Sequence, residues 1–497
     1  MFNLSIDIID AVIVVGYLAG VLMLGLWVGR GQKSTVDYFL GDRSLPGWAI
    51  LLSIVATETS TVTFLSIPGI TFALQGDLRF LQITFGYIAG RLLVVWILLP
   101  LYFRGQPFTS YEVLQRRFGS ASRRTTSVLF LVTRNLSDAL RLYLTALALQ
   151  QVVGLDLNVC VVLLGVITIA YTYFGGVKSV IWNDCLQFII YMIGAAVALW
   201  VVFSKLPGGA EQVWQFAQQH DKLRLLDFNT SLTSPTMTFW AGLIGGMFLT
   251  AGTHGTDQLT VQRLLSARTQ RSAAWALAIS GLIVCLQFLL FLGIGIALSC
   301  FYEVFPPEVP FEASDNDRAL AHFIVHHLNV GLVGLTLAAV FAAAMSTLSS
   351  SLNSSATSLI NDIWLPLSKK ELSPAAQLRL SRLATAGFGV VQIGIALVSH
   401  QLGAVESTVM SVLKITGFAT GPILGLYLLA VLARQVEQRA ALIGFVGGLT
   451  LISFVALATD LYWPWYAAVG ALATFLFGWI ASLLFDQSSD TVQTHDD

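Results

Sequence analysis

Charged residues are scarce in this chain of 497 residues: Asp, Glu, Lys and Arg make up 11% of it, whereas 56% of its residues are hydrophobic. Soluble domains carry about a quarter charged residues, so the composition excludes an ordinary soluble protein. The mean hydropathy is +0.75. We therefore expect an all-α polytopic membrane protein, because helices satisfy their own backbone polar groups inside a bilayer.

The chain also has few cysteines and almost no net charge. The four cysteines, Cys160, Cys185, Cys285 and Cys300, lie in or at the ends of apolar runs without metal-type spacing, so free thiols are expected. A formal net charge of −1 provides neither a basic surface for nucleic acid nor a polybasic tether to a membrane. His254 and Asp257 stand three residues apart without a third ligand nearby, so the sequence does not predict an enzyme.

Long apolar runs are abundant. Runs of about 20 residues predict thirteen membrane-spanning helices, near 11–28, 46–74, 80–103, 125–150, 157–174, 179–203, 236–258, 273–300, 328–357, 380–400, 407–432, 437–459 and 464–485. The first run follows Asp7 and Asp10 rather than a basic segment, so we expect a retained span and not a signal peptide. Residues 1–485 then form a single transmembrane domain and 486–497 a cytoplasmic tail.

The basic residues predict the orientation. With the loop after the first span in the cytoplasm, 18 of the 27 Lys and Arg residues lie on the inner side, five lie outside and four lie within spans. Since inner loops carry the excess of positive charge, we expect the N-terminus outside and the C-terminus in the cytoplasm. The expected location is the cell membrane, and in bacteria the inner membrane.

Two predicted spans contain polar interruptions. The second carries ATETSTVTFLSIPG from Ala56 to Gly69, and the seventh carries TAGTHGTDQLTVQR from Thr250 to Arg263. Interrupted membrane helices leave carbonyls and amides that ions and substrates use in transporters. Four intact spans separate the two breaks, which is typical of an inverted repeat with halves at about 46–203 and 236–432. Tight packing of two Gly- and Thr-rich helices is the alternative.

The ninth span ends in a helix crowded with hydroxyls. Ala343, Ser346, Thr347, Ser350 and Ser354 stack at spacings of three and four residues, so one helical face is small and rich in oxygen. Such a face either lets helices approach closely and hydrogen-bond across the gap, or ligates a bare alkali cation through several oxygens.

At this point the motifs resemble those of the sodium:solute symporters, the family of the sodium/glucose, sodium/proline and sodium/sialic acid cotransporters. The resemblance covers nearly the whole chain and includes the break at Ala56–Gly69, YTYFGGVKSVIWNDCLQ (171–187), TDQLTVQR (256–263), the serine helix and TGPILGLYLL (420–429). It implies a LeuT-type fold of ten core helices in two inverted halves, 5+5, with further helices at the ends.

The resemblance also implies where sodium binds. The main site of the family would fall on the carbonyls of Ala56, Thr59 and Ala343 and the hydroxyls of Ser346 and Thr347. A second sodium site of some members would use Asp184, Ser346, Ser349 and Ser350. An aspartate within a span is costly unless it is paired, and a cation beside three hydroxyls would pair Asp184; capping of a neighbouring helix or an ion pair with Lys178 is the alternative.

The substrate pocket of the sugar carriers is not reproduced. Glu58 stands where they have an amide, Lys414 where they have a glutamine, and Thr253 in place of their gating tyrosine. The candidate substrate-binding residues are Glu58, Ser60, Thr63, Arg141, Thr250, Thr253 and Lys414. A pocket with charges of both signs suits a charged solute such as an amino acid, a sugar acid or an acylated amino sugar; a neutral sugar or polyol bonded by Glu58 is the alternative, and Glu58 could instead pair with Lys414.

Three further charges lie on one helical face. Arg134, Asp138 and Arg141 follow at i, i+4 and i+7 and form an Arg-Asp-Arg network by prediction. Arg141 either binds the substrate or holds Asp138, and Arg91 is expected mainly as a strut between helices.

These residues together predict a sodium-coupled secondary active symporter that imports a small polar, charged organic solute by alternating access. Na+ is the expected coupling ion, and the expected partners are the solute, sodium and the bilayer, without nucleic acid or an obligate protein partner. Proton coupling through Glu58 or Asp138 is an alternative, as is a membrane sensor that reports the solute to a partner.

Overall fold

The computed structural model describes residues 7–308, 311, 313–368, 372–401 and 408–492. These residues are helical throughout apart from turns, loops and one isolated bridge between Leu45 and Ala267. Nine of their helices are long and apolar enough to cross a membrane, or ten when one bent pair is counted as a span. The polytopic membrane protein predicted from the composition is thus confirmed, while the count of thirteen spans stays a prediction.

The described elements, in chain order, are α1 (Ile8–Val28), α2 (Thr35–Leu40), η1 (Gly41–Arg43), α3 (Gly47–Glu58), α4 (Thr61–Phe72), η2 (Leu78–Gln82), α5 (Ile83–Leu93), η3 (Val94–Leu98), α6 (Leu99–Gly105), α7 (Glu112–Phe118), α8 (Ser120–Val153), α9 (Leu157–Lys205), α10 (Gly209–Gln219), η4 (Ala241–Gly245), α11 (Gly246–Gly255), α12 (Gln258–Leu265), α13 (Gln270–Val304), η5 (Ala313–Arg318), α14 (Ala319–His327), α15 (Leu332–Ser358), η6 (Leu359–Trp364), α16 (Leu365–Leu367), α17 (Pro374–Gln401), α18 (Thr408–Leu432), α19 (Gln438–Ala458) and α20 (Trp465–Val492).

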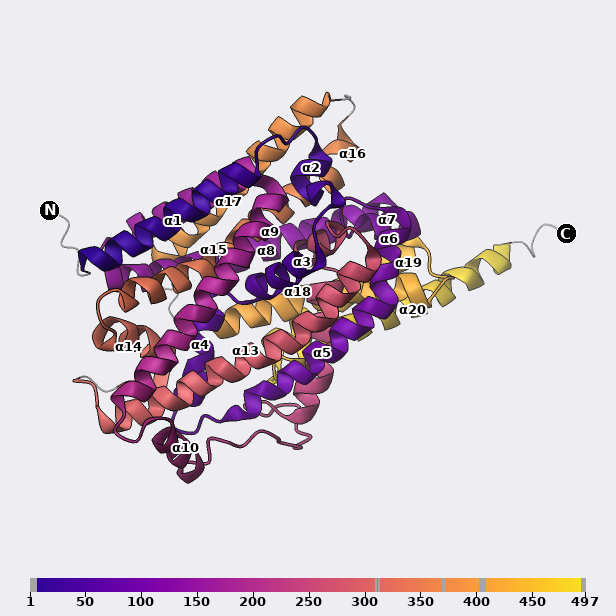
Figure 1. Ribbon diagram of the computed structural model, residues 1–497. Coiled ribbons are helices and arrows are strands. Elements are labelled where there is room, and N and C mark those ends of the chain that lie inside the picture. Colours follow the sequence, from indigo (N-terminus) through magenta and orange to yellow (C-terminus); the bar gives the residue numbers. More distant parts are fainter. Residues whose placement is uncertain (1–6, 309–310, 312, 369–371, 402–407, 493–497) are drawn as a thin grey trace.

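Helix α15 lies in the interior of the bundle. It packs against α9, α1, α8, α17 and α3, and Figure 1 shows it between α1 and α17 on one side and α3 and α18 on the other. From Phe341 to Ser358 every residue is buried. Because a helix buried on all sides exposes its backbone to close neighbours, small side chains such as Ala and Ser are the ones that fit.

Helix α9 combines two predicted spans in one element of 49 residues. At about 1.5 Å per residue it would be far longer than the hydrocarbon core of a bilayer if it were straight. Gly176 interrupts it with φ 56° and ψ −160°, a conformation that favours glycine. A Cβ at this position would meet the carbonyl oxygen of Tyr38 at 2.5 Å, so a side chain is excluded here by both backbone angle and space.

A buried lysine ties the end of α4 to the loop after α10. The Nζ of Lys222 donates to the carbonyls of Thr71, Ala73 and Gly76 at 2.8, 2.9 and 3.3 Å. Thr71 and Ala73 lie at the end of α4, where the last carbonyls have no intrahelical partners and the dipole favours a cation, and Gly76 lies in the turn that follows. Burial lowers the pKa of Lys222 to about 8.

Replacement of Lys222 by methionine is expected to destabilise the protein by about 1–3 kcal/mol, because it strands buried carbonyls. Since the unfolded chain holds the lysine proton more tightly than the folded chain, the advantage of the wild type over Lys222→Met should grow as the pH rises from about 8 into the usual lysine range. Thermal unfolding in detergent across this pH range measures both effects. Lys205→Met, at an exposed position, is the control, and equal midpoints for the two variants would contradict the tether.

Candidate functional site

The first break separates α3 from α4. Helix α3 ends at Glu58, the helical segments on either side are bent by 58°, and Thr59 and Ser60 adopt extended backbone angles. The hydroxyl of Thr59 donates back to the carbonyl of Val55 at 3.1 Å, the kind of local bond with which Ser and Thr compete with helix hydrogen bonds. The break predicted from the sequence is therefore present.

The second break separates α11 from α12. Helix α11 ends at Gly255, and Asp257 begins α12 as an N-cap whose side chain accepts from the amide of Leu259 at 2.8 Å. Asp-capped helix starts are common because the carboxylate satisfies an orphan amide. The interruption predicted within TAGTHGTDQLTVQR is therefore present too.

The residues predicted for the main sodium site meet where α15 faces the first break. The hydroxyl of Ser346 donates to the carbonyl of Ala56 at 2.8 Å and to that of Ala343 at 3.2 Å. Thr347 donates to the carbonyl of Thr57 at 3.0 Å. A cluster of neutral oxygens, buried and drawn from a broken helix and its neighbour, fits the ligand set that an alkali cation requires.

Thr59, the remaining predicted ligand, lies beside this cluster. Its hydroxyl accepts from the side-chain amide of Gln287 on α13 at 2.7 Å, and the residue is almost wholly buried. Gln287 thus holds Thr59 in place. The carbonyl of Thr59 is the one that the family resemblance assigns to sodium.

Asp184 on α9 is wholly buried, and its two carboxylate oxygens have different surroundings. Oδ2 accepts from the hydroxyls of Ser53 at 2.5 Å and Thr57 at 3.3 Å and from Nη2 of Arg263 at 3.1 Å. Oδ1 is buried without a hydrogen-bond partner among the described atoms. The open Oδ1 is an acceptor that a cation could use, so the carboxylate fits the second sodium site. The alternative ion pair with Lys178 is wrong, because Lys178 pairs with Asp37 at 3.8 Å.

The serines assigned to the second site lie on the next turn of α15. Ser350 donates to the carbonyl of Ser346 at 2.6 Å and accepts from Arg263; Ser349 donates to the same carbonyl at 3.3 Å. Arg263, at the end of α12, therefore bridges Asp184 and Ser350. The predicted ligands are close together, and the guanidinium is a cation at this place that the sequence did not indicate.

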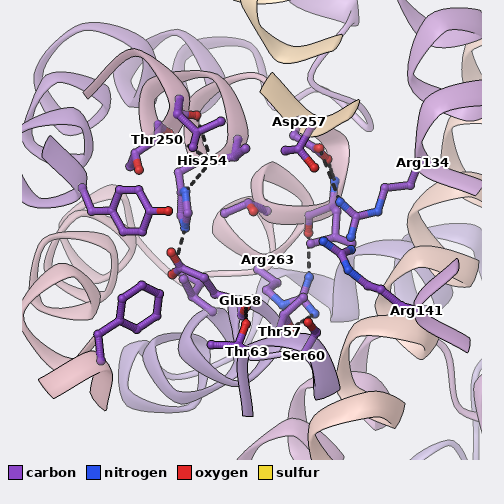
Figure 2. Close-up of a pocket in the computed structure, with 18 of the residues that line it drawn as sticks. Thr57, Glu58, Ser60, Thr63, Arg134, Arg141, Thr250, His254, Asp257 and Arg263 are labelled. Carbon is purple, nitrogen blue, oxygen red and sulfur yellow. Dashed lines mark hydrogen bonds and ion pairs between the residues drawn. The ribbon is translucent and has the colours of Figure 1, made fainter. Parts of the chain in front are cut away.

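A cavity of about 150 Å³ lies beside both breaks. Of the candidate substrate-binding residues, Glu58, Ser60, Thr63, Arg141, Thr250 and Thr253 line it, and Figure 2 shows most of these side chains around one space. The side chain of Lys414 lies outside the described residues. Phe80, Tyr87 and Phe288 add an aromatic wall, so the cavity combines apolar rings with a few polar groups as ligand sites do.

One charged cluster lies where α3, α5 and α11 meet. Arg91, with no exposed surface, forms an ion pair with Glu58, and Nε2 of His254 lies 3.2 Å from Nη2 of Arg91 and 3.5 Å from Oε2 of Glu58. Arg91 is thus a strut between helices, as predicted. His254 was missed as a pocket residue, because its partners are distant in sequence.

The other charged cluster lies on the opposite side of the cavity (Figure 2). Arg134 bonds Asp138 at 2.7 Å and lies 3.7 Å from Asp257, while Nη1 of Arg141 bonds Asp138 at 2.5 Å. The predicted Arg-Asp-Arg network is therefore present. Nε of Arg141 is buried without a partner among the described atoms, so this guanidinium has a donor that Asp138 does not use.

A broken helix facing an oxygen-rich helix, beside a charged cavity in a membrane bundle, defines a secondary transporter. The family model of the sodium:solute symporter family matches residues 38–448. The chain is 31% identical over 484 residues to the sodium/sialic acid symporter of Aliivibrio fischeri, covering 97% of this chain and 94% of that one. It is 30% identical over 455 residues to the human sodium/iodide cotransporter, with 89% and 68% covered.

Solved structures agree. The substrate-bound, outward-open structure of a Na+-coupled sialic acid symporter matches with a TM-score of 0.88 at 29% identity, covering 96% of this chain and 98% of that one. MHP1, a nucleobase-cation-symport-1 transporter, shares the fold with a TM-score of 0.57 at 13% identity, with 93% and 96% covered. The chain belongs to the sodium:solute symporter family. It is a multi-pass sodium:solute transporter and not an enzyme.

Replacement of Asp184 by asparagine is expected to destabilise the protein by about 3–5 kcal/mol, because it leaves Arg263 buried without its counter-charge. Thermal unfolding in sodium-free choline buffer measures this cost. Asp37→Asn removes a partly exposed pair and should cost no more than about 1 kcal/mol. The double variant Asp184→Asn with Arg263→Gln should recover part of the loss; an Asp184→Asn midpoint equal to that of the Asp37→Asn control would refute the buried pair.

Proposed function

We propose that this protein imports a small anionic solute, a sugar acid of the sialic acid type, together with sodium by alternating access. The observation that carries the proposal is Arg141, which lines the cavity with one side of its guanidinium bonded to Asp138 and its Nε without a partner. Arginine suits carboxylate recognition because its planar fork donates two parallel hydrogen bonds. The relatives named as sialic acid symporters support this class of solute.

The charge balance of the cavity is compatible with a solute that carries one negative charge. Glu58 is paired with Arg91, Asp184 with Arg263, and the two aspartates beside the cavity with Arg134 and Arg141. The described site therefore carries no surplus acid that would attract a cationic solute. A bound carboxylate would add one negative charge, which sodium ions on the neighbouring helix can compensate.

The hydroxyls around the cavity suit the rest of a sugar acid. Ser60, Thr63, Thr250 and Thr253 provide oxygens that both donate and accept hydrogen bonds. Phe80 and Phe288, 6.0 Å apart and nearly parallel, provide an apolar surface for a ring face or an acyl group.

Sodium bound at the main site would couple binding of the solute to opening of the transporter. Sodium arriving from outside would hold the carbonyls of Ala56 and Thr59 against Ser346 and Thr347 on α15, and it would complete the wall of the cavity beside Glu58. Linkage requires that sodium and solute raise each other's affinity. Release of both ligands would follow when α15 moves away from the break.

We also propose the finer architecture: thirteen spans, two inverted halves of five core helices, an external N-terminus and a cytoplasmic C-terminus. The support is the pair of broken helices at matching positions, the glycine interruption that divides α9 into two membrane-length parts, and the excess of basic residues on one side.

Ser346→Ala should abolish most of the thermal stabilisation by sodium, because the hydroxyl belongs to both proposed sites. A ligand that binds the folded state raises the melting point by mass action, so unfolding in sodium and in choline buffers measures the effect. Ser354→Ala is the matched control, since Ser354 is equally buried on α15 but bonds only within its helix. A sodium shift in Ser346→Ala as large as that of the control would exclude the site.

Arg141→Gln should weaken binding of sialic acid roughly tenfold to a hundredfold, which corresponds to a charge-assisted hydrogen bond of about 1.5–3 kcal/mol. Asp138 keeps Arg134 in this variant, so no buried charge is stranded. The methyl ester of sialic acid, which lacks the negative charge, should bind wild type and variant alike. Stabilisation by neutral sugars but not by the acid, or an equal loss for acid and ester, would contradict recognition of a carboxylate by Arg141.

A further inference from the structure

His254 occupies a central position that the sodium sites and the Arg141 subsite do not use. It lies on α11 one residue before the second break, it is 5% exposed, and its ring lines the cavity. Figure 2 shows it with Glu58 on the side of the cavity that faces Arg141 and Asp257. The charged groups that face it from neighbouring elements are Glu58, Arg91 and, after the break, Asp257.

The contacts of His254 favour one tautomer. Arg91 can only donate, so we assign Nε2, 3.2 Å from Nη2 of Arg91, as an acceptor without a proton. The proton of the neutral ring is then on Nδ1, which lies 3.0 Å from the hydroxyl of Thr253. Thr253 can accept this bond because its own proton goes to the carbonyl of Leu249 at 3.1 Å.

A proton and Arg91 therefore compete for the same lone pair. A proton on Nε2 would face the guanidinium at hydrogen-bond distance, which is repulsive, and would turn the ring into a donor toward Oε2 of Glu58, 3.5 Å away. Arg91 already has Nε and Nη1 buried without partners in the described structure. Glu58 Oε2 is within reach of both groups, so it can be shared between Arg91 and a protonated His254 without a large movement.

We propose that His254 is a proton-binding site that is filled when an anionic solute enters the cavity, so that a proton accompanies sodium and solute. The proposal rests on the proposed symport function for its solute, but the proton site itself is defined by Arg91, Glu58 and Thr253. A negative charge in the cavity favours the protonated ring, because opposite charges attract each other more strongly in a poorly solvated site than in water. The proton comes from solvent and returns to it on release.

The linkage has a definite sign. If the solute-bound protein holds more protons than the empty protein, affinity for the solute rises as the pH falls. Over the range in which about one proton is taken up per solute, the affinity should rise about tenfold for each pH unit. The charge moved across the membrane with each solute molecule should be more positive by one than in transport coupled to sodium alone.

The first experiment examines the proton site without any solute. Selective ¹⁵N labelling of histidine in the purified protein, with His254→Gln to assign the resonance, should show a neutral ring with its proton on Nδ1 at neutral pH in sodium buffer. The amide oxygen of glutamine can still accept from Arg91, so this variant should fold. An imidazolium, or a neutral ring with its proton on Nε2, would overturn the proposal.

The second experiment measures coupling, with sialic acid as the probe in sodium buffer. Titration calorimetry in two buffers of different ionisation enthalpy gives the protons taken up per solute: we expect uptake in the wild type, no uptake in His254→Gln, and unchanged uptake in His326→Gln, whose residue is exposed on α14. Binding with no uptake in the wild type, or uptake that survives in His254→Gln, would overturn the coupling.

Failure of the proposed function has a different signature. If sialic acid does not bind, the assigned solute is wrong; the ¹⁵N measurement is then repeated with the solute that does stabilise the protein in sodium. Protonation of His254 on addition of that solute supports the proposal, and an unchanged neutral ring refutes it.

Discussion

The structure depends on one requirement: backbone carbonyls released inside a membrane must find partners within the protein, because no water is there to bond them. At the first break the carbonyls of Ala56 and Thr57 find Ser346 and Thr347 on α15. This contact is consistent with the small and polar side chains of the buried segment of α15, which let the neighbouring helices pack closely. The same kinds of oxygen that replace water for the backbone can replace water around a sodium ion, and this is where we propose that sodium binds.

Buried charged side chains, like the released carbonyls, need partners within the protein. Glu58, Asp138 and Asp184 are each held by arginines, from α5, from α8 and from α12. The pairs of Glu58 and Asp184 each join two different helices, whereas the pairs of Asp138 are local to α8. A transporter that moves a charged solute needs such pairs to be balanced in the empty state and adjustable when a charge enters. Arg141 and His254, on opposite sides of the cavity, are the two groups that we propose respond to the charge of the solute.

Much of this arrangement could be predicted from local sequence. Breaks near Glu58 and His254 follow from hydroxyl, β-branched and glycine residues in apolar runs, and the hydroxyl face of α15 follows from helical spacing. The contacts of Arg91 and Arg263 could not, because their partners are 33 and 79 residues away and depend on how the bundle closes. The division of α9 illustrates the same limit: two spans were predicted with a loop, whereas a single glycine in an unusual conformation is enough to separate the two parts. The role of Lys414 stays a prediction.

The lysine at the far end of α4 gives this helix an asymmetry. Its ammonium group, surrounded by three carbonyls, is in effect a monovalent cation attached to the chain, and it cannot be diluted or exchanged. At the other end of the same helix the comparable carbonyl and hydroxyl oxygens face a place suited to a free ion. Cation binding at the first end therefore does not depend on the salt composition of the medium, whereas at the other end, where we propose a sodium site, it would. Below the pKa of Lys222, one end of α4 thus carries a bound cation in any medium, whereas the other end would gain one only when sodium is present.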